Sequence, residues 1–228
     1  MQKRITVTFN KISFIQKIDI KSIMDIFLKN PYDEDKGIGF TKAEIIEDVL
    51  ETTLVKRVPT SLQEFDPKSG NFVQRDIFIF DEITFYIDLQ NNLIYSYSSA
   101  SKLNSVKSIL KNYIKNNNVI YNNLDLNPRN FINDLINNKF ECAISEIVIR
   151  KFIYNQGAQG KFSAHILDSK TGQKLLDDYS EEIQKMTINV SSSENNDFTL
   201  TISTNNTLGI RSEDDDFLSI LSNLKNQI

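Results

Sequence analysis

The chain has 228 residues and a formal net charge of −4, and its pI of about 5.2 is unusual for a dedicated nucleic-acid binder. Hydrophobic residues make up 40% of the sequence and charged residues 25%, a balance that predicts a folded core and excludes a disordered chain. No stretch approaches about 18 consecutive apolar residues, so we expect no membrane-spanning helix and no membrane partner.

The length fits one large domain or two small ones, and the charges are divided unevenly between the two halves of the chain. Residues 1–117 carry 16 basic and 15 acidic side chains, whereas residues 118–228 carry 10 and 15. We predict two α+β halves, 1–116 and 117–228, joined by the asparagine-rich segment 115–123. The first half is the more favourable place for phosphate contacts.

The first half is expected to open with a strand, because its basic N-terminus has neither the apolar core nor the cleavage site of a signal peptide. Helices, a run of strands and a closing helix follow from the hydrophobic periodicity. The predicted elements are a strand at 4–10, helices at 18–28 and 41–51, strands at 53–58, 72–80, 83–89 and 93–98, and a helix at 102–115.

The second half shows a similar plan. Pro128 suits the first turn of a helix, and the acidic run 213–216 suits the N-terminus of the last helix, where carboxylates meet the positive end of the helix dipole. The predicted elements are strands at 118–124, 143–154, 161–168, 184–190, 197–203 and 207–211, a helix after Pro128 and a helix from Asp214.

Local sequence matches recur in the same order in both halves and predict a duplicated architecture. Asparagine tolerates the positive φ of tight hairpin turns, and Asp-x-Lys-x-Gly segments also read as hairpin turns. The matches are the basic pairs Lys56–Arg57 and Arg150–Lys151, the Asp-x-Lys-x-Gly segments 66–70 and 168–172, the Asn-Asn turns 91–92 and 205–206, and the Ser-Ile-Leu triplets 108–110 and 219–221.

The fold predicted from this order is α+β, with two pseudo-repeated halves that each run strand, helix, antiparallel meander, helix. This element order resembles the TATA-binding-protein type of fold, and also the half-domains of sliding clamps and recombination proteins. No sequence motif of those families is present. The resemblance therefore implies an architecture, and we carry no residue and no function over from it.

The single histidine and the single cysteine are interpreted as structural residues. His165 is expected on a strand with a local hydrogen bond, and Cys142 is expected to be a small buried side chain. One cysteine excludes an intramolecular disulfide and fits a reducing, cytoplasmic location. We predict no catalytic residue, no metal ligand and no cofactor.

Three further motifs are interpreted as ordinary loops or helix starts. Gly157-Ala158-Gln159-Gly160 matches the Gly-x-x-Gly of KH domains, but it joins two predicted strands and reads as a hairpin loop. Glu34-Asp35-Lys36 fits part of a metal-dependent nuclease motif, but it follows Asn30-Pro31 and reads as a solvated loop. The run 213–216 could hold a metal ion, but helix-start charge explains it more simply.

Two basic features are candidates for nucleic-acid contact. Lys107, Lys111 and Lys115 recur every four residues along one stripe of the predicted closing helix. An ordinary amphipathic helix with a solvated face is the alternative. The side chains expected on the other side of that helix are Leu103, Val106, Leu110 and Ile114.

The second basic feature is the pair of strand dipeptides Lys56–Arg57 and Arg150–Lys151. Neighbouring side chains on a strand point to opposite faces, so each sheet face would receive one basic residue from each half. Backbone contact with nucleic acid needs several such charges together. Salt bridges to nearby carboxylates are the alternative.

These features predict a non-enzymatic binding or adaptor protein, whose partner is another protein or a second copy, with weak contact to the nucleic-acid backbone. Abundant Asn, Ile and Lys have AT-rich codons and indicate a microbial or phage genome, for which antiviral defence is the suggested context. Two alternatives stay open. One is a metal-dependent nuclease or other hydrolase with a carboxylate site, and the other is a structural subunit of an oligomer.

Overall fold

The computed structural model describes residues 3–114, 118–124, 126–137, 140–191, 197–213 and 216–225. In chain order its elements are β1 (Lys3–Phe14), α1 (Ile20–Leu28), β2 (Ile38–Ile46), β3 (Val49–Asp66), β4 (Asn71–Asp88), β5 (Leu93–Ser96), α2 (Ala100–Tyr113), β6 (Val119–Asn122), α3 (Pro128–Asn137), β7 (Glu141–Asn155), β8 (Ala158–His165), α4 (Ser169–Tyr179), the 3₁₀ helix η1 (Ser180–Glu182), β9 (Ile183–Ser191), β10 (Phe198–Ser203), β11 (Thr207–Ser212) and α5 (Phe217–Lys225).

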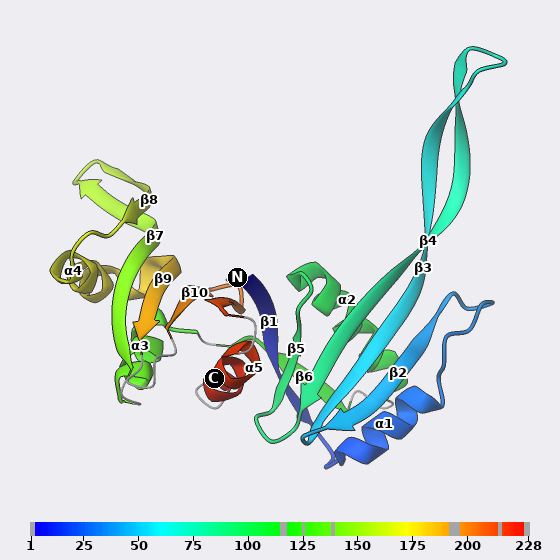
Figure 1. The fold of residues 1–228 in the computed structure, drawn as a ribbon, viewed down its shortest axis with the longest axis horizontal. Coiled ribbons are helices and arrows are strands. Elements are labelled where there is room, and N and C mark those ends of the chain that lie inside the picture. The colour runs from blue at the N-terminus through cyan, green and yellow to red at the C-terminus, as the bar shows by residue number, and fades with distance from the viewer. Residues whose placement is uncertain are drawn as a thin grey trace. The chain divides into compact units, whose positions relative to one another are not determined.

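The described strands form one large antiparallel sheet, which confirms the α+β prediction (Figure 1). The strand order is β2-β3-β4-β5-β1-β11-β10-β9-β7-β8, and β6 pairs with β1 beside this path. The chain divides into two compact units. Unit 1 comprises Met1–Lys11, Tyr97–Ala100 and Tyr121–Ile228, and unit 2 comprises Ile12–Ser96 and Ser101–Ile120.

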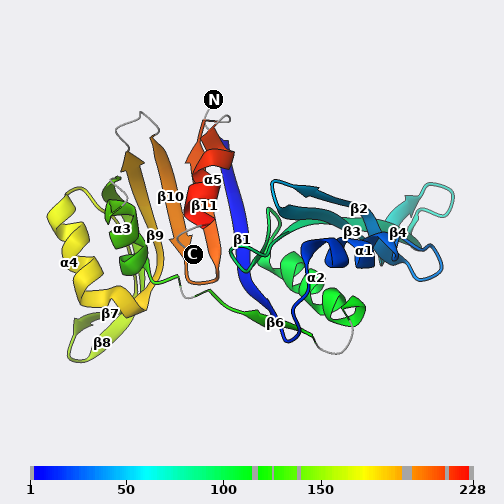
Figure 2. The ribbon, with the colours of Figure 1, turned by 90° about the horizontal axis from the view of Figure 1, so that it is seen from below.

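Unit 2 packs α1 and α2 against one face of its strands (Figure 2). The ring of Phe27 from α1 lies 4.5 Å from that of Phe40 and 6.0 Å from that of Phe85, between centroids. Every second residue of β3 and β4 points to this core, because successive side chains of a strand point to opposite faces. The predicted apolar side of α2 is confirmed, because Leu103, Val106, Leu110 and Ile114 are all buried.

Both predicted Asn-Asn turns are present. Asn92 and Asn206 adopt positive φ values of 55° and 62°, the conformation that asparagine tolerates better than most residues. In unit 2 the N–H of Ile12 donates to the Asn92 carbonyl at 2.8 Å, and in unit 1 the N–H of Phe9 donates to the Asn206 carbonyl at 2.9 Å. Each turn therefore also fixes its hairpin to β1.

The predicted helix at 41–51 is wrong. Residues 38–46 form β2, and β3 begins at Val49 after a tight turn in which Glu47 and Asp48 have φ values of 48° and 64°. Alanine and glutamate favour a helix here only weakly. Pairing of Ile46 with Val49 and of Ile45 with Leu50 closes a hairpin that buries Leu50, so tertiary packing overrides the local preference.

The strands predicted at 53–58, 72–80 and 83–89 belong to two much longer strands. β3 and β4 each contain 18 residues, and they pair without a register shift from Val49↔Asp88 to Asp66↔Asn71. The predicted turn at 66–70 is confirmed, with Gly70 at φ 67°. Pro59 lies opposite Phe78 of β4 and beyond Lys56, where pairing with β2 ends, so its missing N–H removes no hydrogen bond to β2.

The segment 168–172 is not a hairpin turn, which corrects one of the matches between the halves. Asp168 is the N-cap of α4, and its side chain accepts a hydrogen bond of 2.9 Å from the N–H of Thr171. Aspartate suits both a turn and a helix cap, so the pattern was ambiguous. Because β8 and α4 are inserted between β7 and β9, the fold does not show the duplication, which stays a prediction.

Candidate nucleic-acid interface

The outward side of the unit 1 sheet is a polar surface made by four adjacent strands. Strand register aligns its side chains in three rows across β1, β11, β10 and β9. We call this surface the hydroxyl face. Its rows are Arg4, Arg211, Thr199 and Asn189; Thr6, Gly209, Thr201 and Thr187; and Thr8, Thr207, Ser203 and Lys185.

The hydroxyl face follows from strict alternation of polar and apolar residues. The residues between the polar positions, such as Val7, Leu208 and Ile202, are completely buried. The helices of unit 1 cover this apolar side of the sheet, with α5 on β11 and α3 and α4 on β7 (Figure 2). Successive side chains of a strand point to opposite sides, so the threonines and arginines must face away from these helices. No described helix packs on them.

Two arginines stand directly opposite each other on this face. Arg4 of β1 pairs with Arg211 of β11, and both side chains are exposed. The guanidinium of Arg4 lies over Gly209, where a Cβ atom would be 3.5 Å from Nη2 and 3.6 Å from Nε. Like charges placed directly opposite in a sheet are destabilising. A Cβ atom at Gly209 would make ordinary van der Waals contact with this guanidinium, so the glycine is not required for the placement of Arg4.

Neither of these arginines has a carboxylate within ion-pair distance among the described residues. The other arginines do have partners. Arg129 lies 2.7 Å from Asp177 and Arg150 lies 3.3 Å from Glu182, measured between nitrogen and oxygen. Arg75 pairs with Glu64 at 3.6 Å, and the Arg57 guanidinium stacks 4.7 Å from the centroid of the Phe78 ring. Within the described ranges, the opposed pair therefore has no ion-pair partner.

A carboxylate beside the hydroxyl face, that of Glu146, is neutralised. Glu146 of β7 lies 3.1 Å from the Lys185 ammonium and accepts a hydrogen bond of 3.2 Å from the Thr187 hydroxyl. The hydrogen bond from Lys185 lowers the pKa of this carboxyl group, so it stays ionised and paired. Thr187 also lies 3.2 Å from the Thr201 hydroxyl, which extends the polar network across two strands.

A polar hollow lies at the Lys185 end of the face. Its volume is about 330 Å³, and two ammonium groups, Lys161 and Lys185, contribute to its wall. The hollow extends the third row of the face toward β8. The residues that line it are Val148, Lys161, Gln184, Lys185, Ser203, Thr204 and Asn205.

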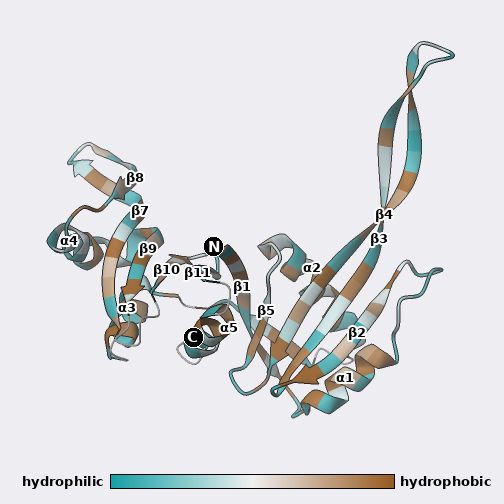
Figure 3. Ribbon diagram, viewed as in Figure 1, coloured by the Kyte–Doolittle hydropathy of each residue, from teal (hydrophilic) through white to brown (hydrophobic). Residues whose placement is uncertain are grey.

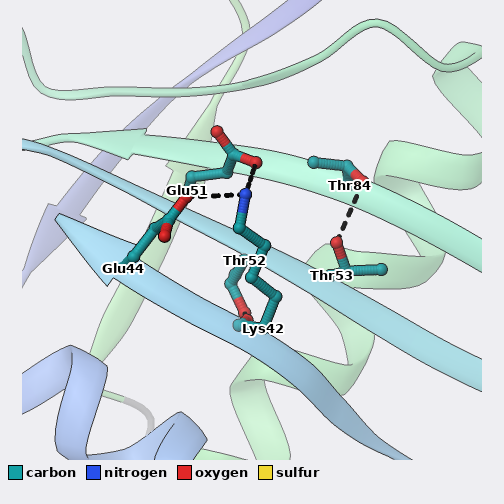
Figure 4. Close-up of polar contacts among 6 residues, drawn as sticks. All are labelled: Lys42, Glu44, Glu51, Thr52, Thr53 and Thr84. Atoms are coloured by element: carbon teal, nitrogen blue, oxygen red, sulfur yellow. Dashed lines mark hydrogen bonds and ion pairs between the residues drawn. The ribbon is translucent and has the colours of Figure 1, made fainter. Parts of the chain in front are cut away.

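The outward face of the unit 2 sheet has a different electrostatic character. Lys42 lies 2.6 Å from both Glu44 and Glu51, and the hydrogen bonds to Glu44 and then Glu51 raise its pKa (Figure 4). Thr53 and Thr84 share a hydrogen bond of 3.0 Å on the same face. Here carboxylates compensate the basic residue, so this face is less suited to a phosphate than the hydroxyl face.

The predicted lysine stripe lies on α2 of unit 2. Lys107 and Lys111 are one helical turn apart, and burial together with the charge of Lys111 lowers the pKa of Lys107. Lys115 lies outside the described residues. The stripe and the hydroxyl face belong to different units, so the structure does not describe them as one site.

Three of the four residues in the two predicted basic dipeptides contact a local partner. Arg57 stacks on Phe78, and Lys56 is exposed on β3 opposite Asp81. Arg150 and Lys151 both pair with Glu182, at 3.3 and 3.6 Å. This second pair lies where the β7–β8 ladder shifts register between Ile149 and Phe152.

The remaining motifs are loops where the structure describes them. Residues 34–37 form a turn in which Asp33 accepts hydrogen bonds from the N–H groups of Asp35 and Lys36, and Gly157 lies in the β7–β8 turn. In the acidic run, Asp214 and Asp215 lie outside the described residues. Elsewhere in the described ranges, no three His, Cys, Asp or Glu residues are grouped to hold a metal ion. No described helix is long and apolar enough to cross a membrane.

His165 lies on a strand, as expected, whereas Cys142 is only partly buried, which corrects the expectation of a buried side chain. His165 ends β8 opposite Glu146 with its side chain exposed, and the structure does not show the expected local hydrogen bond. Cys142 is half-buried on β7, and burial raises the pKa of its thiol to about 11.

A raised thiol pKa predicts slow alkylation of Cys142 in the folded protein. Relative to the ordinary value of 9.0, a pKa of about 11 leaves roughly 100-fold less thiolate at pH 8. Iodoacetamide labelling of folded and urea-unfolded protein, followed by mass spectrometry, measures the difference. Equal labelling rates in the two states would contradict it.

No family model matches this sequence, and the search of curated proteins gives no match. The case for the hydroxyl face therefore rests on its own geometry. One pattern in the sequence could have identified the hydroxyl face. The alternate residues of segments 4–8, 185–189, 199–203 and 207–211 include Thr, Ser, Asn, Gly, Lys and Arg but no Asp or Glu.

Proposed function

We propose that this chain is a non-enzymatic binding protein whose hydroxyl face contacts the sugar–phosphate backbone of nucleic acid. The observation that carries the proposal is the opposed pair Arg4 and Arg211, for which no ion-pair partner is found among the described residues. Guanidinium groups bind phosphate oxygens through two parallel hydrogen bonds, and a bound phosphate would relieve the repulsion between the two cations.

The rest of the hydroxyl face is polar, although several of its hydroxyl groups already donate within the protein, such as Thr199 to Asn189, and Thr8 and Thr201 are buried. Threonine, serine and asparagine side chains make a large share of protein contacts to phosphate and sugar. Successive rows are two residues apart along each strand, or roughly 6.5–7 Å. Extended arrays of phosphates can therefore meet several rows together, from Arg4 and Arg211 at one end to Lys185 at the other.

The same surface lacks the means to read sequence. None of its side chains is aromatic, so it offers no platform on which unpaired bases could stack. Affinity would come from phosphate charge, which is denser along a duplex than along a single strand. We therefore expect duplex to bind more tightly than single strands and base composition to have little effect.

The acidity of the whole chain limits the affinity. With a net charge of −4, long-range attraction to nucleic acid is weak, and we expect a dissociation constant in the range of roughly 10⁻⁶–10⁻⁴ M typical of non-specific binding. Two phosphate contacts by Arg4 and Arg211 predict a slope of about −2 in a plot of log affinity against log salt concentration.

Fluorescence anisotropy with labelled duplex and single-stranded oligonucleotides, titrated at several salt concentrations, tests this function. The expected result is saturable binding at low salt that weakens steeply as salt rises, with similar affinity for unrelated sequences. A wild-type protein that binds neither duplex nor single strand at low salt would overturn the proposal.

The cellular setting follows from composition. A single cysteine fits a reducing cytoplasm, and the abundance of Asn, Ile and Lys fits a microbial or phage genome. We propose that the protein acts there as an adaptor that holds nucleic acid without processing it, as an antiviral defence component would. Recovery of nucleic acid with the natively purified protein, before and after nuclease treatment, tests this setting.

A further inference from the structure

The β3–β4 hairpin extends well beyond its neighbouring strands in unit 2. Pairing with β2 ends at Lys56, and pairing with β5 involves only Tyr86, Ile87 and Asp88 of β4. Residues 57–80 therefore form a two-stranded ribbon, which we call the arm (Figure 1). Among the described residues only its base is contacted, by a hydrogen bond from Arg57 to Gly37 and by the ring of Tyr32 on Phe80. An isolated two-stranded hairpin is only marginally stable in water, so a structure of this length calls for a covering layer.

Both faces of the arm are apolar, as the hydrophobic bands in Figure 3 indicate. The unbroken register assigns each side chain to one face. The aliphatic face also carries the Glu64–Arg75 ion pair, and on the aromatic face the rings of Phe65 and Phe72 contact each other at 5.5 Å. The aliphatic face holds Val58, Leu62, Val73, Ile77 and Ile79, and the aromatic face holds Pro59, Phe65, Phe72, Phe78 and Phe80.

The aromatic face has the exposed area of an interface. Its phenylalanines are between 52% and 70% exposed. At about 200 Å² per aromatic side chain, the four rings leave roughly 500 Å² of apolar surface in water. A standard protein–protein interface buries about 800 Å² on each partner, so these rings and the polar residues between them are sufficient for one side of a stable dimer.

The charges of the arm indicate what covers it. Residues 57–80 carry three basic side chains, Arg57, Lys68 and Arg75, and three acidic ones, Glu64, Asp66 and Asp76. This balance gives no attraction to a polyanion and no repulsion between two identical arms. One sheet face packs on another at a distance of about 10 Å, and a second copy presents a ribbon with the same twist and the same side chains.

We propose that the chain forms a two-fold symmetric homodimer in which the aromatic faces of two arms pack against each other. Such an interface is self-complementary, since the same patch is used by both copies. The phenylalanines provide buried aromatic anchors of the kind that dominate binding energy in interfaces. The proposal is independent of nucleic-acid binding, because it uses none of the residues of the hydroxyl face.

Analytical ultracentrifugation of the full chain over a micromolar concentration range tests the dimer with a matched pair of double variants. Phe65→Thr with Phe72→Thr removes a contacting pair from the aromatic face and keeps strand-forming residues. We expect its dimer affinity to fall about 100-fold or more, because aromatic anchors at an interface each carry about 2 kcal/mol or more. Leu62→Thr with Val73→Thr makes an equivalent change on the aliphatic face and should leave the dimer affinity within about twofold.

Chemical crosslinking gives a second measurement that does not require a destabilising change. In a Cys142→Ser background, Gln74→Cys places a thiol on the aromatic face and Arg75→Cys places one on the aliphatic face. A short bismaleimide should link two chains efficiently through position 74 and poorly through position 75. Circular dichroism and thermal unfolding establish that each variant is folded.

The outcomes of these experiments show whether a second copy of the chain or a different protein covers the arm. A wild-type chain that sediments as a monomer throughout the concentration range overturns the dimer and leaves the arm to a different protein. Equal effects of the aromatic and aliphatic variants would also overturn it, because the face would then be wrong. Neither result would affect binding of short oligonucleotides, so failure of this proposal is distinguishable from failure of the proposed function.

Discussion

The double substitution Arg4→Gln with Arg211→Gln is expected to lower the affinity for duplex about 100-fold. A hydrogen bond to a charged group contributes about 1.5 kcal/mol or more, and about 1.4 kcal/mol corresponds to a tenfold change in affinity, so each arginine accounts for about a factor of ten. The salt slope should become shallower by about two, because two phosphates are no longer neutralised by arginine. The free energy of unfolding should stay the same or rise by up to about 1 kcal/mol, because two like charges that face each other across β1 and β11 have been removed.

The matched control is Arg129→Gln with Arg150→Gln. It removes the same charge from the same unit, but each of these arginines already pairs with a carboxylate. We expect affinity to change less than about threefold and stability to fall by about 1 kcal/mol or less for each surface pair. Equal losses of affinity in both double variants would show that net charge, and not the hydroxyl face, determines binding.

This test is informative because the affinity for nucleic acid and the stability of the fold are expected to respond differently to the same substitutions. A residue that serves the fold loses stability when it is changed, whereas a residue kept for binding loses affinity and leaves stability intact or improved. Arg4 and Arg211 are expected to behave in the second way. Anisotropy and urea unfolding on the same preparations measure both quantities.

Much of the fold was accessible from sequence because it is encoded locally. The Asn-Asn turns at 91–92 and 205–206, the helix after Pro128 and the apolar side of α2 each depend on residues only a few positions apart. The segment 41–51 was not accessible in this way. Its helical preference is small, and the hairpin that replaces it is stabilised by a core to which distant residues such as Phe85 contribute.

The candidate site was less accessible because it is assembled from distant strands. Arg4 and Arg211 lie at opposite ends of the chain and meet only through the β1–β11 ladder. The basic pair at 150–151 attracted attention in the sequence, yet Glu182 neutralises it in the fold. Register therefore decides which cations are compensated, and a single sequence does not specify register between strands that are far apart.

Truncation of Phe85 is expected to have the largest effect on stability. The ring is completely buried in unit 2 and meets Phe27 at 6.0 Å with an interplanar angle of 76°. Phe85→Ala would remove this ring packing and leave a cavity, so we expect the free energy of unfolding to fall by about 3–5 kcal/mol. Urea denaturation measures the loss as a lower midpoint with little change in slope.

Phe72→Ala is the matched control, because it makes the same chemical change in the same strand. Phe72 is 70% exposed on the arm, so at low protein concentration we expect a loss of about 0.5 kcal/mol or less. At higher protein concentration the wild type gains stability from dimer formation by mass action, and the variant should not show this gain. The gap between wild type and Phe72→Ala should therefore widen with concentration, whereas the gap caused by Phe85→Ala should be present throughout. A large, concentration-independent loss in Phe72→Ala would place the arm within the core and contradict its assignment as an intermolecular surface.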